Sequence, residues 1–187
     1  LFALALTLVW LGKLDEAQSL LEESTASYQD MGALAEVARL YAVLSQVKAL
    51  QGSYSQARAL AQTCLTMAQE SGSRREIGIS CWVLGGIATA EQAYAQAQSW
   101  LRESVGALEE VGLPDILSAA LATAGYAAWG AGQFLQAEEY LAQALDSAQQ
   151  THSLGVFLLA LPGVALLMVS RGNVGCAIEL YALASRH

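Results

Sequence analysis

The stretch GQFLQAEEYLAQAL, from Gly132 to Leu145, decides the fold, because its pattern recurs along the whole chain. At a 40-residue period, one alanine keeps the same phase in five successive units: Ala17, Ala57, Ala97, Ala137 and Ala177. Five positions before this alanine stands a glycine in four of the five units, and Gln92 is the exception. Self-similarity at a fixed period of this length predicts a repeat array.

Each unit is predicted to hold two helices, helix A followed by helix B. In the second unit, Leu40, Leu44 and Val47 are spaced to form one face of helix A, and Gly52 then ends it. At Gln92 we expect either a non-glycine residue at positive φ or a turn of another shape. We take the chain as a single repeat domain, residues 1–187, with these units: 1–32, 33–72, 73–112, 113–152 and 153–187. Because it begins without methionine and stops within a unit, we expect it to be a fragment of a larger protein.

The composition is typical of closely packed helices. Hydrophobic residues make up 55% of the chain and charged residues only 14%, which argues against a disordered protein. The formal net charge of -8 repels phosphate backbones, so we expect no direct binding of nucleic acid. Cys64, Cys81 and Cys176 lack the spacing of a zinc site or a disulfide framework. They favour a reducing, cytoplasmic compartment, and we expect them to be buried in helix interfaces.

The uncharged run from Leu154 to Ser170 approaches the length of a membrane span. Pro162 interrupts this run, however, and the run keeps the phase of the repeat. A spanning helix needs about 20 apolar residues. We therefore interpret the run as a buried repeat helix, with a kink or short break at Pro162, and expect no contact with a membrane.

These units resemble tetratricopeptide repeats. The family has a small residue early in helix A, a glycine at the turn, and an alanine in helix B. The small residue of helix A is here Ala5, Ser45, Gly85, Gly125 or Ala165, depending on the unit. The resemblance implies an all-α fold, a right-handed superhelical solenoid of antiparallel helix pairs with about four and a half repeats. The family's typical unit has 34 residues, so this chain carries a long form.

The 40-residue form resembles the repeat regions of large bacterial signal-transduction ATPases and LuxR-type transcriptional regulators. That resemblance rests on the length and character of the units alone. It implies a sensor or scaffold segment whose partners include the flanking domains of the same chain.

In the family, helix A lines the concave face of the solenoid. Carrying the family's groove positions onto this sequence selects residues of which only Arg39 is charged, with Trp82, Tyr126 and Trp129 as the expected anchors of a protein, peptide or small ligand. The remaining chosen contacts are Gln46, Gly86 and Thr89. The other positions are Trp10, Ala42, Ala49, Ile79, Ala122, Leu159, Leu166 and Val169.

Two other interpretations of this apolar face stay open. The aromatic residues could pack against neighbouring units or a flanking domain, or the face could pair with a second copy of the chain as a homodimer. The protein would then be a structural spacer or an oligomerisation element.

The sequence offers no catalytic motif, so we predict a non-enzymatic protein without cofactor or metal. It lacks a glycine-rich phosphate loop, an HExxH motif and a nucleophile elbow. His152 falls at a turn, where we expect it to end a helix. The adjacent carboxylates Glu138 and Glu139 point in different directions on a helix, so we expect solvated side chains there.

Overall fold

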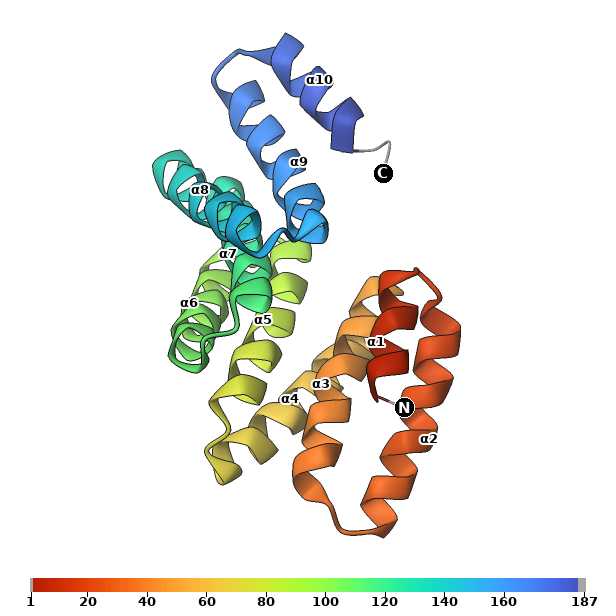
Figure 1. Ribbon diagram of the computed structural model, residues 1–187. Helices are drawn as coiled ribbons and strands as arrows, with labels where there is room; N and C mark the ends of the chain where they lie inside the picture. The colour runs from red at the N-terminus through yellow and green to blue at the C-terminus, as the bar shows by residue number, and fades with distance from the viewer. Residues whose placement is uncertain (1, 185–187) are drawn as a thin grey trace.

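The structure is a computed structural model that describes residues 2–184, and Figure 1 shows this part of the chain as a stack of α-helices joined by short turns. Ten α-helices and no strand occur within these residues. The odd-numbered helices are α1 (Phe2–Trp10), α3 (Leu34–Leu50), α5 (Arg74–Ala90), α7 (Pro114–Gly130) and α9 (Leu154–Ser170). The even-numbered helices are α2 (Leu14–Asp30), α4 (Tyr54–Ser71), α6 (Tyr94–Val111), α8 (Phe134–Thr151) and α10 (Val174–Ala184).

The 40-residue period of the sequence is the period of the helices. The even-numbered helices begin at equivalent positions, as Tyr54 and Tyr94 illustrate. The turns depend on one residue at positive φ, which is a glycine at seven places, with φ between +68° and +82°. Gln92 (φ 61°) and His152 (φ 55°) adopt the same conformation without being glycine. Of the two alternatives expected at Gln92, the structure has the residue at positive φ, and His152 ends α8 as expected.

The helices form two layers. Each helix packs on the next one along the chain, and each odd-numbered helix also packs on the next odd-numbered helix. Among the described residues, the even-numbered helices do not contact one another. The odd-numbered helices, which are the predicted A helices, are therefore the inner layer, and the even-numbered helices are the outer layer.

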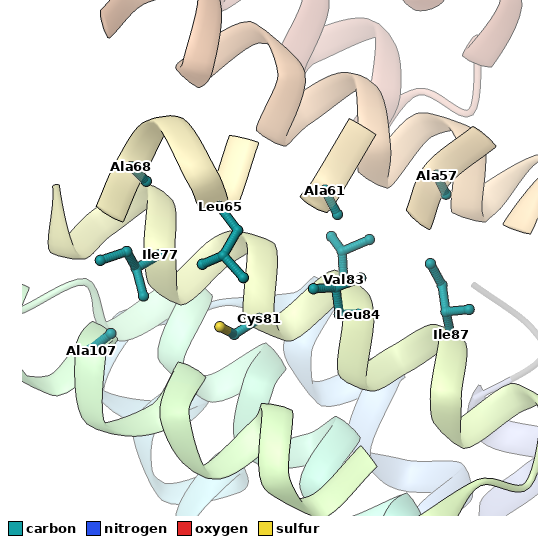
Figure 2. Close-up of a cluster of buried hydrophobic side chains, with 10 residues drawn as sticks. All are labelled: Ala57, Ala61, Leu65, Ala68, Ile77, Cys81, Val83, Leu84, Ile87 and Ala107. Atoms are coloured by element: carbon teal, nitrogen blue, oxygen red, sulfur yellow. The ribbon is translucent and has the colours of Figure 1, made fainter. Parts of the chain in front are cut away.

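Small residues let the two layers approach closely. A Cβ atom built at Gly85 of α5 would lie 2.5 Å from Cγ of Leu101 on α6, and one at Gly125 of α7 would lie 2.6 Å from Cγ of Leu141 on α8. Leu101 and Leu141 are each 1% exposed. Figure 2 shows the packing between two successive units, where Ala57, Ala61 and other residues of α4 face side chains of α5.

Polar side chains connect successive units at the surface. We call these contacts the seam pairs, and they join residues 33 to 35 positions apart. They are Gln18 with Gln51 (3.1 Å), Arg58 with Glu91 (2.5 Å), Gln98 with Gln133 (2.5 Å) and Glu138 with Arg171 (2.5 Å). Each exposed ion pair stabilises the fold by roughly 0–1 kcal/mol. Their recurrence fixes the register of one unit on the next.

The sequence predicted a kink or a short break at Pro162. Helix α9 runs through Pro162 without a break, so the predicted break is wrong. Its neighbour Gly163 is buried against the side chain of Leu141. Within residues 2–184, no helix meets the length and hydropathy that crossing a membrane requires.

Candidate functional site

The inner layer encloses a cavity of about 440 Å³, which we call the inner hollow. All five odd-numbered helices contribute to its wall. Most of the wall is apolar, and its large side chains include Phe2, Val43, Ile79, Trp82, Ile116 and Val156. Four polar residues also line it, Gln46, Arg75, Asp115 and Ser153. Ligand sites commonly combine such an apolar wall with a few polar groups.

A second cavity of about 260 Å³ adjoins the inner hollow and shares Gln46, Leu50 and Trp82 with it. Gly86 lines this second cavity, and the nearest heavy atom to a Cβ atom built there would be Cγ2 of Thr123, at 3.9 Å. The two adjacent glycines of α5 therefore differ, since Gly85 meets a neighbouring helix and Gly86 faces open space.

The structure brings only part of the predicted groove together. Gln46 and Trp82 line both cavities and Gly86 lines the second, whereas Arg39 and Thr89 line neither. Thr89 donates its hydroxyl to the backbone oxygen of Gly85 at 2.8 Å. Of the other positions, Ile79 lines the inner hollow and Ala49 the second cavity, while the side chain of Trp10 lies outside the described part.

The three predicted aromatic anchors each bridge to the next inner helix. The indole N–H of Trp82 donates to Oγ1 of Thr123 at 2.9 Å, and that of Trp129 donates to Oγ of Ser170 at 3.0 Å. The Tyr126 hydroxyl donates to the backbone oxygen of Leu159 at 2.6 Å. Trp82 also presents its ring to both cavities, but Tyr126 and Trp129 line neither.

Arg39 belongs to a charged cluster that the sequence did not reveal. Its guanidinium lies 3.0 Å from Glu36 and 3.9 Å from the carboxylate of Glu76, which is only 6% exposed. Ser73 donates its hydroxyl to the same carboxylate, and Arg75 approaches it to 4.0 Å. A buried carboxylate requires such compensation. Arg39 thus neutralises a buried charge instead of facing the groove.

Sequence reasoning missed Arg75, Asp115 and Ser153. It placed the groove along the middle of every A helix, whereas the inner hollow also extends to the first turns of α5 and α7 and to the residue before α9. One clue was present, because Arg75 and Asp115 stand 40 residues apart, at equivalent positions of neighbouring units.

The cysteines do not supply a reactive group to the site. Cys64 and Cys81 are fully buried, as predicted, whereas Cys176 is exposed. Burial raises the pKa of the Cys64 thiol to about 11 and that of Cys81 to about 12. Both stay protonated at neutral pH, and the thiolate is the nucleophilic form. In the part of the chain that the structure describes, no cluster of histidine, cysteine or carboxylate side chains has the form of a metal site.

Comparison with protein-family models and with curated proteins finds no match for this chain. The class of protein is therefore defined by the fold itself, an all-helical array of stacked helix pairs with a cavity on its inner layer.

Proposed function

We propose that this chain is a non-enzymatic binding module whose inner hollow takes a small, mainly apolar ligand. The observation that carries the proposal is a cavity of about 440 Å³ whose wall includes every odd-numbered helix. Small-molecule sites measure roughly 300–1,000 Å³ and are lined mostly by apolar and aromatic side chains. A long peptide or a protein helix would need a continuous groove, but Tyr126 and Trp129 lie outside both cavities.

The proposal extends to the architecture and its biological setting. We propose that the helix pairs form a right-handed superhelical solenoid of the tetratricopeptide type, used as the sensor segment of a bacterial transcriptional regulator. The 40-residue helix pairs, with small residues where the layers meet, support this setting. A ligand that touches all five inner helices would bias the curvature of the whole array, and flanking domains could detect that change.

Filling the cavity tests the proposal. N-phenyl-1-naphthylamine, a neutral apolar fluorescent probe, should bind the 187-residue chain, and Gln46→Trp should weaken its binding at least tenfold because Gln46 lines both cavities. Gln62→Trp is the matched control, since Gln62 is exposed on the outer helix α4. No binding to the unaltered chain, or equal binding by the two variants, would contradict the proposal.

One observation favours a second function, association through the last helix pair. Tyr181 on α10 is 62% exposed, although the equivalent Leu141, Leu101 and Leu21 are 1% exposed or less. Ile178 beside it is 64% exposed. If this apolar face pairs chains, sedimentation velocity will give a larger species as concentration rises, and Tyr181→Glu will abolish that species. A monomer at every concentration would remove the second candidate.

A further inference from the structure

In the described part of the chain, three of the four polar side chains of the inner hollow have no partner, and the fourth, Arg75, has only a long ion pair with Glu76. Within residues 2–184, the side chains of Gln46, Asp115 and Ser153 make no hydrogen bond or ion pair. Arg75 approaches a carboxylate only at 4.0 Å, and its Nε atom is buried without a hydrogen-bond partner. Buried polar groups are nearly always hydrogen-bonded, so the buried Nε atom of Arg75 requires an explanation. Asp115 is exposed, and its carboxylate is open to solvent.

Polar groups just outside the hollow behave differently. Arg74, the neighbour of Arg75, makes two hydrogen bonds to Glu110, at 2.6 and 2.8 Å. The hydroxyl of Tyr126 also has a partner on the next inner helix, and so does the indole N–H of Trp82, although the ring of Trp82 lines the hollow. These three side chains are therefore paired, whereas Gln46, Asp115 and Ser153 in the cavity have no partner among the described residues. Two buried atoms outside the cavity, Nε of Arg39 and Oγ of Ser80, also lack a hydrogen-bond partner within this part of the chain.

The position of Arg75 is not explained by helix stability. It is the second residue of α5, and the N-terminal end of a helix disfavours a cation. Asp115 is the second residue of α7, so the two residues are equivalent in neighbouring units, and α5 packs on α7. Packed helix axes lie about 8–10 Å apart. Opposite charges thus line one cavity across adjacent helices without forming an ion pair.

We infer that the inner hollow selects a small zwitterion with an apolar side chain, namely an apolar α-amino acid. Arg75 binds the carboxylate, Asp115 binds the ammonium group, and the wall around Trp82 takes the side chain. The inference rests on the proposed function, because it names the ligand class of the same cavity. A ligand with only one charge would leave either Arg75 or Asp115 unpaired, and an unmade hydrogen bond to a charged group is costly.

Calorimetric titration of the 187-residue chain with three isosteric probes tests the inference. L-phenylalanine carries both charges, phenethylamine lacks the carboxylate, and 3-phenylpropanoate lacks the ammonium group. L-phenylalanine should bind roughly 10- to 100-fold more tightly than either analogue, the range expected for one hydrogen bond to a charged group.

Variants assign the two charges. Arg75→Met should remove the preference for L-phenylalanine over phenethylamine, and Asp115→Asn should remove the preference over 3-phenylpropanoate. Arg74→Met is the matched control, because Arg74 lies outside the cavity, and it should keep both preferences. Circular dichroism identifies any variant that fails to fold, and Arg75→Gln then replaces Arg75→Met.

The outcomes separate this inference from the proposed function. If N-phenyl-1-naphthylamine binds in the cavity but L-phenylalanine binds no better than its analogues, the zwitterion inference is overturned and the proposed function stands. If neither compound binds, both are overturned. If Arg74→Met changes the preferences as much as Arg75→Met does, the assignment of the carboxylate to Arg75 is wrong.

Discussion

The seams between units and the inner hollow use polar side chains in opposite ways. Along the seams, Arg58 meets Glu91 and Arg171 meets Glu138, each partner coming from the neighbouring unit. In the hollow, Arg75 and Asp115 line one cavity without pairing with each other. The difference separates groups that hold the array together from groups that stay free for a ligand. Substitutions along a seam should therefore change stability, and substitutions in the hollow should change binding.

The largest effect is expected where a buried apolar side chain between the two layers is removed. Leu141 of α8 is 1% exposed and packs beside Gly125 of α7 and Gly163 of α9. Leu141→Ala should lower the free energy of unfolding by about 2–5 kcal/mol, measured by urea denaturation. Leu135→Ala on the same helix, at a position 76% exposed, should change it by about 0.5 kcal/mol or less. Equal losses of unfolding free energy in the two variants would contradict the assignment of Leu141 to the core between the layers.

The adjacent glycines of α5 sharpen the comparison. Gly85→Ala places a methyl group against the buried Leu101 and should destabilise the fold by about 1–3 kcal/mol. Gly86→Ala meets no close atom and should stabilise α5 by up to about 1 kcal/mol through helix propensity. Thermal denaturation of both variants gives opposite shifts if Gly85 lies in the interface between α5 and α6 and Gly86 faces the open inner side. Shifts of the same sign would refute that division.

A substitution at Tyr126 tests whether this predicted ligand anchor instead serves to join α7 to α9. Tyr126→Phe removes one hydrogen bond to α9, so it should cost about 0.5–1.5 kcal/mol of stability and leave probe binding unchanged. Burial raises the pKa of Tyr126 above its ordinary value. The stability that the neutral Tyr126 hydroxyl contributes is therefore fully present below the pKa of tyrosine in the unfolded chain, about 10. It is lost as pH rises through the pKa of Tyr126 in the folded protein. The phenylalanine variant should lack this loss, and weakened probe binding would return Tyr126 to the site.

The smallest effect is expected at an exposed seam pair. The Arg171 guanidinium hydrogen-bonds to Glu138 and lowers the pKa of that carboxyl. The stability that the ion pair contributes is therefore present above the pKa of glutamate in the unfolded chain, about 4.3. It is lost as pH falls through the pKa of Glu138 in the folded protein. In Glu138→Gln, the melting temperature should no longer fall at acidic pH for this reason. Glu139→Gln, which changes the next residue along the helix, should keep that fall. Identical pH profiles would show that the pair adds nothing.

The fold was largely predictable because it depends on local and periodic features. Glycines such as Gly52 and Gly132 recur at the turns, and the small residues Gly85 and Gly125 stand where the two layers meet. Gln92 could be placed in the same turn because its phase left no other position.

The site was less predictable, since it depends on how the units rotate relative to one another. Trp82 and Gln46, both predicted as groove residues, line the same cavity. Arg75 and Asp115 were missed, because local sequence does not say that the cavity reaches the first turns of α5 and α7. Trp129 was expected to face a ligand, but its hydrogen bond to Ser170 could not be foreseen from residues 41 positions apart.

The most direct test of the central claim compares the indole N–H resonances of Trp82 and Trp129 in one NMR titration. Trp82 lines the inner hollow, whereas Trp129 bridges α7 and α9 outside it. Trp82→Phe and Trp129→Phe assign the two resonances, and N-phenyl-1-naphthylamine is then added to the 187-residue chain. The account predicts a saturable shift of the Trp82 resonance with little change at Trp129. A shift at Trp129 alone, or no shift at either indole, would contradict it.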